Sequence, residues 1–367
     1  MKRIGVLTGG GDCPGLNAVL RAIYRTASAR GYELLGIEDG FAGLIDLDRR
    51  RPYGNRMMSE EMVRGILPRG GTILGSSNSD DPFHYVAPGS DREEDVSDRV
   101  VDNARRLGLD ALICIGGDGT MTIAHGLAGK GLRVVGVPKT IDNDLLATDY
   151  TFGFDTALHT AVDALDKLHT TAESHDRVML LEVMGRHAGW IALHAGIAGD
   201  ADVILIPEIP YSAAAVLAKI ERRRAQGRYF SIIAVAEGAV PIGGCESYIE
   251  QARPGRAGRL GGAAERVAAA LRALEPTLDC RVTVLGHLQR GGSPSPKDRL
   301  LGTRFGVAAV ELVERGQFDH MVCLRTPHIR SVPIAEAIAR RNVVDPQGEL
   351  CAAARAVGIC LGSPDEL

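Results

Sequence analysis

Short apolar runs alternate along the first part of the chain with longer stretches in which apolar residues recur at helical spacing. The apolar runs at 3–8, 110–117 and 133–139 predict buried strands, and the stretches at 17–31 and 121–131 predict helices. This alternation is typical of βαβ units, whose strands are parallel. The first part of the chain is therefore predicted to form a doubly wound parallel sheet.

The same alternation starts afresh after about residue 150. Four further apolar runs predict strands at 177–183, 203–208, 230–238 and 281–287. The predicted fold class is therefore α/β, with two doubly wound parallel-sheet, Rossmann-like domains facing one cleft. We expect one domain at 1–153, joined by part of 289–340, and a second at 154–288, joined by part of 341–367.

Composition and charge exclude several classes of protein. The 367 residues, 45% of them hydrophobic, are enough for two cores, and two stretches rich in Gly, Pro and Asp, 79–95 and 243–262, predict surface loops. Lys+Arg 42 nearly balance Asp+Glu 46, and no apolar run reaches the roughly 18 residues of a spanning helix, so we expect no nucleic-acid or membrane partner. Seven cysteines without CxxC spacing predict reduced thiols. Because the chain opens directly on a predicted strand, we expect a cytoplasmic protein without a signal peptide.

Two glycine-rich turns at the ends of predicted strands are candidate phosphate-binding sites. TGGGDCPG places Gly9, Gly10 and Gly11 just before a helix, and IGGDGT places Asp118 between glycines. Backbone N–H groups without side chains can close on a phosphate, and a carboxylate at such a turn is well placed to hold Mg²⁺. The first turn lacks the third glycine of the dinucleotide fingerprint. The structural alternative is an ordinary glycine-rich turn, with Asp118 capping the next helix.

The motif PKTIDND supplies two carboxylates, Asp142 and Asp144, close to the cation of Lys139. Phosphoryl transfer to an alcohol requires a group that accepts the alcohol's proton and groups that cancel the phosphate charge. One carboxylate can act as the base while the other organises a metal or its neighbours. The alternative, an Asp-rich surface turn, is disfavoured because apolar VVGV leads directly into the motif.

Three further motifs at strand ends offer partners for an anionic substrate. VMGRHAGW contains Arg186, AVAEG contains Glu237, and VTVLGHLQRGG contains His287 and Arg290. Taken separately, each arginine fits a salt-bridged surface residue equally well, and His287 fits a core imidazole. Taken together, they indicate a sugar-phosphate site.

The chain resembles the 6-phosphofructokinase family over roughly residues 3 to 325, through seven motifs in order: GGGDCPGLNA, GGDGT, PKTIDND, TFGFDTA, ESHDRVMLLEVMGRHAGW, AEG and GHLQRGGSPSPKDR. The resemblance implies phosphoryl transfer to the 1-hydroxyl of fructose 6-phosphate, giving fructose 1,6-bisphosphate in glycolysis, with Mg²⁺ as the obligatory ion. It also implies that the domain at 1–153 binds the donor and Mg²⁺ and that the domain at 154–288 binds fructose 6-phosphate.

The resemblance implies a role for each matching residue. Asp142 would be the general base, Lys139 and Gly11 would also be catalytic, and Asp118 would hold Mg²⁺. The residues expected to bind the donor are Gly10, Gly11, Gly117, Gly119 and Thr120. Those expected to bind fructose 6-phosphate are Thr140, Asp142, Asp144, Arg177, Met184, Gly185, Arg186, Glu237, Arg281, His287 and Arg290. Arg177 and Arg281 would reach into the site of a neighbouring subunit, which implies a homodimer or homotetramer.

The sequence departs from the family pattern at the donor site. Asn78 stands where an arginine often bridges the phosphates, with Lys139 as a possible replacement, and Ile123 stands where a glycine is common. Pyrophosphate users tend to pair an aspartate at position 119 with a lysine at 139, whereas ATP users commonly have glycine at both. The combination of Gly119 with Lys139 is mixed, and we favour ATP as the donor because glycine leaves the nucleotide's path open. Pyrophosphate is the alternative.

The effector site expected from the resemblance is incomplete. Arg21 and Arg25 match allosteric members, but His169, Glu60 and Gln226 stand where basic residues are expected, so we expect weak regulation.

Two other functions stay open: a lipid-kinase or NAD-kinase type of enzyme, which shares GGDGT but leaves the other motifs unexplained, and a non-catalytic paralogue. Sedoheptulose 7-phosphate is an alternative substrate, because it presents a similar end to the same arginines.

Overall fold

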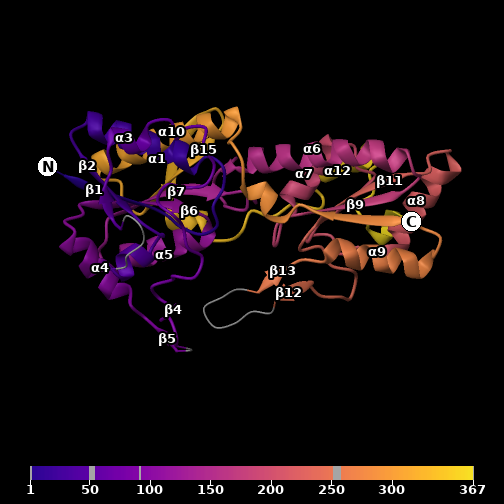
Figure 1. Cartoon of the computed structure of the whole chain (residues 1–367), viewed down its shortest axis with the longest axis horizontal. Helices are drawn as coiled ribbons and strands as arrows, with labels where there is room; N and C mark the ends of the chain where they lie inside the picture. The colour runs from indigo at the N-terminus through magenta and orange to yellow at the C-terminus, as the bar shows by residue number, and fades with distance from the viewer. Residues whose placement is uncertain (1, 49–53, 91, 251–257, 367) are drawn as a thin grey trace.

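A computed structural model of the chain describes residues 2–48, 54–90, 92–250 and 258–366. The molecule is elongated and has two lobes, each built around one sheet, with the N-terminus in the first lobe and the C-terminus in the second (Figure 1). The fold class predicted from the sequence, α/β with two Rossmann-like lobes, is confirmed.

The first lobe is built around an eight-stranded sheet in the order β16-β15-β7-β6-β1-β2-β3, with β8 paired to β7. Its strands are β1 (Arg3–Thr8), β2 (Glu33–Ile37), β3 (Arg56–Met57), β6 (Ala111–Gly116), β7 (Val134–Thr140), β8 (Phe152–Gly153), β15 (His320–Arg325) and β16 (His328–Pro333). The central strands are parallel, whereas β3 and β16 are antiparallel edge strands. Every residue of β6 is buried, as expected of a parallel strand covered on both faces.

Helices cover both faces of this sheet because successive strand residues point to opposite sides. Helices α1 (Leu16–Ala29), α3 (Glu60–Val63) and α10 (Pro296–Arg315) pack on the face that Ile113 and Ile115 share. Helices α2 (Ala42–Ile45), α4 (Ser97–Arg106), α5 (Asp118–Gly129) and α11 (Ile334–Ala337) pack on the face that Leu112 and Cys114 share. Figure 1 shows α1, α3 and α10 on one side and α4 and α5 on the other.

The second lobe contains a four-stranded parallel sheet in the order β10-β11-β9-β14. Its strands are β9 (Val178–Val183), β10 (Val203–Leu205), β11 (Ser231–Ala236) and β14 (Cys280–Val284). One face is covered by α6 (Phe154–Glu173) and α7 (Trp190–Ala198), with α12 (Glu349–Ala356) packed on α7, and the other by α8 (Ala213–Ala225) and α9 (Ala263–Leu274). Two short 3₁₀ helices are η1 (Gly286–Arg290) and η2 (Pro364–Glu366).

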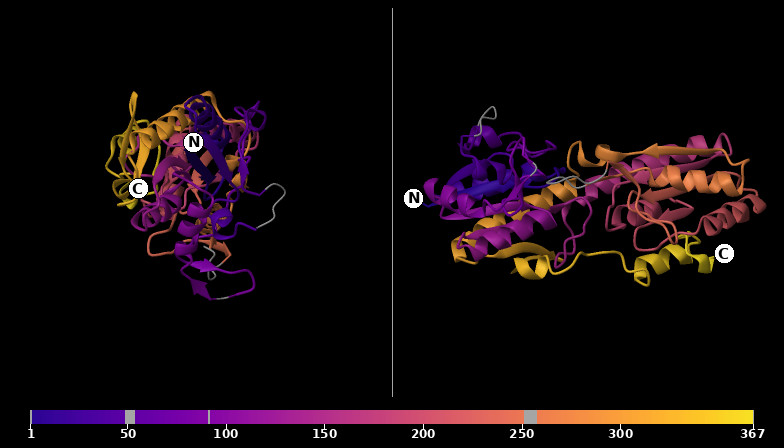
Figure 2. Two further views of the ribbon diagram at one scale, coloured as in Figure 1. Left: turned by 90° about the vertical axis from the view of Figure 1, so that its left-hand side faces the viewer. Right: turned by 90° about the horizontal axis from the view of Figure 1, so that it is seen from below.

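The chain crosses between the lobes more than once. After β15 and β16 have completed the first sheet, the chain runs back along one side to α12 in the second lobe (Figure 2, right). Cys360 then forms a parallel bridge with Val203 of β10. One hydrophobic core includes residues of α6, α7 and α10 together with both sheets, so the lobes share a continuous packed centre. The domain limits given above stay a prediction.

The two stretches predicted as loops contain strands, so those predictions were partly wrong. Residues 79–95 include the antiparallel pair β4 (Tyr85–Val86) and β5 (Glu93–Glu94). Residues 243–262 include the antiparallel pair β12 (Tyr248–Glu250) and β13 (Arg259–Leu260), although 251–257 lie outside the described residues. Such short strands were missed because two or three residues are too few to show an alternating pattern.

Two other expectations concern membranes and thiols. Among the helices that the structure describes, none is both long and apolar enough to cross a bilayer. All seven cysteines lie in described residues and none of them forms a disulfide there; the reduced state expected from their number and spacing stays a prediction.

Candidate active site

A cleft of about 430 Å³ opens at the carboxyl ends of the central strands of the first sheet. Strand β1 pairs with β2 on one side and with β6 on the other, so the strand order reverses between β1 and β6. Ligands of doubly wound proteins bind at such switch points. The predicted site residues that line this cleft are Gly10, Gly11, Gly117, Asp118, Gly119, Thr120, Lys139, Thr140, Asp142, Asp144 and Arg290.

The turn after β1 brings its backbone against two cations. Lys139 Nζ donates a hydrogen bond to the carbonyl of Gly11, and Arg290 Nη1 donates to the carbonyl of Asp12 at 3.2 Å. A Cβ on Gly11 would lie 2.0 Å from Arg290 Nη1, so any larger residue would displace the end of that side chain. Gly10 has a φ of 73°, a conformation that glycine adopts without strain. The glycines of this turn therefore permit a close approach of backbone, cation and ligand.

The second glycine turn begins helix α5. Gly117 is the N-cap, and Asp118 is the first helical residue and makes no capping hydrogen bond, so the alternative of a capping aspartate is wrong. The Asp118 side chain is 33% exposed and faces the cleft. A Cβ on Gly119 would meet nothing within 4 Å, whereas Thr120 is buried against Gly9. The helix N-terminus thus presents free N–H groups and one carboxylate to the cleft.

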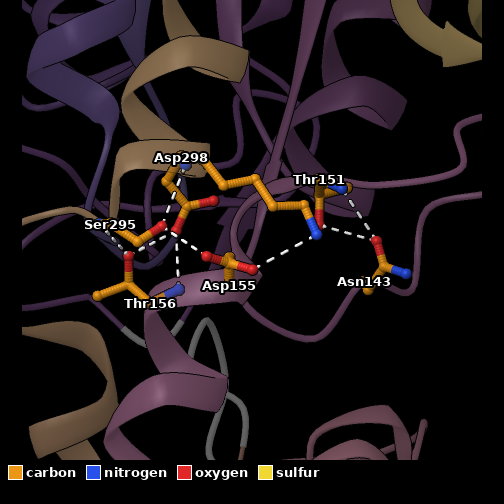
Figure 3. Close-up of polar contacts among 7 residues, drawn as sticks. Asn143, Thr151, Asp155, Thr156, Ser295 and Asp298 are labelled. Atoms are coloured by element: carbon orange, nitrogen blue, oxygen red, sulfur yellow. Dashed lines mark hydrogen bonds and ion pairs between the residues drawn. The ribbon is translucent and has the colours of Figure 1, made fainter. Parts of the chain in front are cut away.

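The TIDND loop is held in shape by its asparagine, which sequence reasoning had not assigned. Asn143 has a φ of 53°, in the left-handed region that asparagine tolerates better than most residues. Its Oδ1 accepts hydrogen bonds from Thr151 N at 2.9 Å and from Thr151 Oγ1 at 3.2 Å (Figure 3). Asp142 N donates to Thr140 Oγ1 at 3.1 Å. This tight loop directs Asp142 and Asp144 toward the same cleft.

Asp142 has the environment of a base. Its Oδ1 is buried and has no hydrogen-bond partner, which excludes the exposed surface turn considered above. Burial, followed by the charge of Asp144, raises the pKa of Asp142 to about 6, against the opposing charges of Arg290 and Lys139. Burial also raises the pKa of Asp144 and lowers the pKa of Lys139. A carboxylate with a raised pKa accepts a proton more readily at neutral pH.

A network of buried and half-buried polar groups joins α10 of the first lobe to α6 of the second. At the start of α6, Thr156 N donates to Asp298 Oδ2 at 2.8 Å, and Thr156 Oγ1 donates to the same oxygen. Ser295, the N-cap of α10, donates through its N to Thr156 Oγ1 at 2.9 Å and through its Oγ to Asp155 Oδ2 at 2.7 Å. Figure 3 shows these contacts together. They lock α6 to α10 and so fix the second lobe relative to the first.

The predicted sugar-phosphate residues of the second lobe follow the carboxyl ends of its strands. Met184, Gly185 and Arg186 follow β9, and Glu237 follows β11. Gly238 N donates to the carbonyl of Gly185 at 3.2 Å, so the two segments are adjacent. Arg186 Nε is buried without a hydrogen-bond partner. Burial, followed by the negative charge of Asp142, raises the pKa of Glu237 to about 7.

Helix η1 joins these segments to the first lobe. Gln289 is fully buried and its Oε1 accepts a hydrogen bond from Met184 N at 2.8 Å. Sequence reasoning missed Gln289, although it lies between two residues that were selected. His287 is exposed, so the alternative of a core imidazole is wrong, whereas Arg290 is half-buried and lines the cleft.

Arg177 and Arg281 lie apart from the rest of the predicted site. Arg177 precedes β9 and Arg281 is the second residue of β14, beside Met179, so both are at the amino ends of these strands. Both bind Asp279, Arg177 through Nε at 2.9 Å and Arg281 through Nη2 at 3.0 Å. A six-residue strand is about 20 Å long, so these arginines are remote from the cleft of their own chain.

The positions of the expected effector site make contacts within the chain. Arg25 forms an ion pair with Glu60, and His169 Nε2 lies 2.9 Å from the carbonyl of Gly199. Gln226 caps the end of α8. The weak regulation expected from the sequence stays a prediction.

Comparison with known proteins identifies similar sequences over the whole chain. Residues 3–313 match the family described as phosphofructokinase. A protein of Chloroflexus aggregans named ATP-dependent 6-phosphofructokinase is 55% identical over 100% of this chain and 99% of its own. A protein of Amycolatopsis methanolica named pyrophosphate–fructose 6-phosphate 1-phosphotransferase is 50% identical over 94% of this chain and 97% of its own. The solved structure of phosphofructokinase from Saccharomyces cerevisiae superposes with a TM-score of 0.76 at 33% identity, covering 92% of this chain and 45% of that one.

Proposed function

The chain belongs to the phosphofructokinase family, and from that premise we propose that it transfers a phosphoryl group from ATP to the 1-hydroxyl of fructose 6-phosphate. The observation that carries the proposal is the buried, unpartnered Oδ1 of Asp142, a residue that lines the cleft together with both glycine turns. A relative 55% identical to this chain is named an ATP-dependent 6-phosphofructokinase. A lipid-kinase or NAD-kinase type of enzyme leaves the residues of the second lobe without a role.

The geometry divides the work of the reaction among a few residues. Asp142 accepts the proton of the 1-hydroxyl group of the sugar. The oxygen of that hydroxyl bonds to the γ-phosphorus of ATP while the bond from this phosphorus to the departing ADP oxygen breaks. Lys139 and Arg290 place positive charge beside the Gly11 turn, where the transferred group gains negative charge on its oxygens. The N–H groups at the start of α5 orient the remaining phosphates.

The carboxylates present fit a magnesium ion that arrives with the donor. Asp118 and Asp144 both line the cleft, so their carboxylates share one site. Within the described parts of the chain no group of three or more metal-ligating side chains occurs. Magnesium is usually held by one or two carboxylates plus substrate phosphates. When bound here, it would be held by Asp118, supported by Asp144, and would neutralise phosphate charge.

The donor follows from the space around Gly119. The open space beside this residue leaves room for the nucleotide beyond its terminal phosphates. Asn78 and Ile123 also line the cleft, in positions where ATP users more commonly have arginine and glycine, and they favour the second candidate, pyrophosphate. Lys139 does not decide between the donors, because it contacts Gly11, where either donor places the transferred group.

The sugar site is expected to require a second copy of the chain. Arg177 and Arg281 are held side by side on Asp279, far from the cleft of their own chain. The edge strand β14 that carries Arg281 also exposes Val284, with Leu288 exposed just beyond it. We therefore infer a homo-oligomer in which these arginines complete the fructose 6-phosphate site of a neighbour, while Thr140, Met184, Gly185, Arg186, Glu237, His287 and Arg290 bind within the chain.

Product analysis tests the proposed reaction. Purified protein is incubated with fructose 6-phosphate, ATP and Mg²⁺, and the product is identified by phosphorus NMR, with glucose 6-phosphate and sedoheptulose 7-phosphate in parallel. The proposal predicts fructose 1,6-bisphosphate, with no reaction of glucose 6-phosphate. If fructose 1,6-bisphosphate forms neither with ATP nor with pyrophosphate, the proposal is contradicted.

A further inference from the structure

The segment between α11 and α12 runs directly beside the catalytic loop. The backbone of Arg341 forms an antiparallel bridge with Leu145, and Asn342 N donates to the carbonyl of Asp144 at 2.9 Å. Asn342 Nδ2 also donates to the carbonyl of Asn143 at 2.9 Å. This part of the chain is the crossing from α11 in the first lobe to α12 in the second (Figure 2, right). The catalytic loop and Arg341 are therefore held in a fixed relation.

The same segment is fastened to the second lobe. Trp190 Nε1 donates to the carbonyl of Asn342 at 2.8 Å, and Val344 N donates to Glu208 Oε1 at 2.8 Å. The backbone at Arg341 and just after it is thus held by groups from both lobes. A side chain on such a support is placed with more precision than one on a free loop.

The guanidinium of Arg341 lies beside Asp118, a residue of the cleft, and makes no hydrogen bond with the residues that the structure describes. Its Nη2 is 4.0 Å from Asp118 Oδ2, which is the outer limit of an ion pair, and its side chain is 44% exposed. A guanidinium has five N–H donors in a planar fork that matches phosphate oxygens. Arg341 is therefore positioned beside the expected magnesium ligand and can still bind an anion.

The charge of the cleft indicates which anion. Its lining contains five carboxylates, namely Asp80, Asp81, Asp118, Asp142 and Asp144, but only two cations, Lys139 and Arg290. Both cations already donate hydrogen bonds to backbone carbonyls of the glycine turn. A donor that brings several phosphate charges into this cleft requires further positive charge on the Asp118 side, away from the glycine turn.

We propose that Arg341 is a donor-binding residue, which contacts the phosphate chain of the donor beside Asp118. The proposal rests on the proposed function in that the donor is a polyphosphate. It assigns to the segment between the lobes a part in donor binding that the local sequence, ARRNVV, does not indicate. It also gives a role to the guanidinium of Arg341, whose nearest carboxylate in the described part of the chain, that of Asp118, is 4.0 Å away.

Nucleotide binding to Arg341→Ala, Arg341→Lys and Arg340→Ala tests the proposal. Arg340 is the exposed neighbour on the same segment and serves as the matched control. Because a hydrogen bond to a charged group contributes roughly 10- to 150-fold to binding, calorimetry should show ATP binding to Arg341→Ala weakened by that factor, in Mg²⁺ and without it. AMP, which lacks the terminal phosphates, should change less than about twofold. Arg341→Lys should fall between, and Arg340→Ala should match wild type.

Three outcomes would overturn the proposal: unchanged ATP affinity in Arg341→Ala, an equal loss of ATP and AMP affinity, or an equal loss in Arg340→Ala. An equal loss of affinity for ATP and AMP would mean that Arg341 maintains the conformation of the loop instead of binding phosphate. The melting temperature of each variant shows whether it is folded. In steady state the KM for ATP should rise while the KM for fructose 6-phosphate stays within about threefold. Failure of the proposed function gives a different result, namely that wild-type protein forms no fructose 1,6-bisphosphate. In that case the comparison of nucleotide binding still decides whether Arg341 contacts the phosphate chain.

Discussion

Replacing Gly11 by alanine perturbs the contact between the glycine turn and Arg290. The new Cβ would lie 2.0 Å from Arg290 Nη1 and 2.8 Å from its Cζ, where ordinary van der Waals contact begins at 3.4 Å. The guanidinium must therefore move by at least about 1.4 Å. Gly11 is not among the glycines with positive φ, so the backbone itself accepts alanine and the effect is steric.

The size of the effect follows from what Arg290 does. A displacement of about 1 Å in a positioning group can cost roughly 10²-fold in rate, and loss of one hydrogen bond to a charged group costs roughly 1.5–3 kcal/mol, or about 10- to 150-fold. Since Arg290 is expected to contact the sugar phosphate and also donates to Asp12, kcat/KM for fructose 6-phosphate should fall about 10- to 100-fold. The melting temperature should change little, because Arg290 is at the cleft surface.

The matched control is Gly119→Ala, in the other glycine turn of the same cleft. A Cβ there meets no protein atom within 4 Å and leaves Arg290 in place, so kcat/KM for fructose 6-phosphate at saturating ATP should stay within about twofold of wild type. Initial rates are measured in a coupled NADH assay with each substrate varied in turn. A Gly11→Ala enzyme with kcat/KM within about threefold of wild type, or a Gly119→Ala enzyme that loses as much, would refute the steric reasoning.

Three further substitutions test other parts of the site. Asp142→Asn keeps the size of the side chain and removes the proton acceptor, so kcat should fall by roughly 10²–10⁴ with little change in sugar affinity; turnover above about half of wild type would exclude Asp142 as the base. Gly119→Asp places a carboxylate in the open space beside the donor and should abolish use of ATP, and an unchanged KM for ATP would argue against that path for the nucleotide. Arg177→Ala should raise the KM for fructose 6-phosphate, and co-assembly with Asp142→Asn chains should restore intact sites; mixed oligomers without recovered activity would count against a shared site.

The parts of the fold that follow from local patterns were predictable. The buried strands at 3–8, 110–117 and 177–183 showed continuous apolar runs because helices cover both faces of each sheet, and the structure contains strands there. The glycine turns at their carboxyl ends line the cleft as expected. In these cases the physical cause, burial or close backbone approach, acts on residues that are adjacent in sequence.

The parts that depend on distant contacts were not predictable. The hydrogen bonds of Asn143 join residues that are eight positions apart in the sequence. By contrast, the bridge between Arg341 and Leu145 and the hydrogen bond from Trp190 to Asn342 each join residues more than 150 positions apart. Nothing in the local sequence of Arg341 marks it as different from Arg340, because what places it is the bridge to the catalytic loop. The hairpin strands β4, β5, β12 and β13 were missed because they are shorter than the pattern that reveals a strand.

The choice of donor is the central claim, and one measurement tests it directly. Wild-type enzyme is supplied with saturating fructose 6-phosphate and Mg²⁺, and initial rates of fructose 1,6-bisphosphate formation are measured with saturating ATP and with saturating pyrophosphate. The open space at Gly119 predicts the faster rate with ATP. A faster rate with pyrophosphate would contradict the assignment of ATP, and absence of product with both donors would contradict the proposed reaction itself.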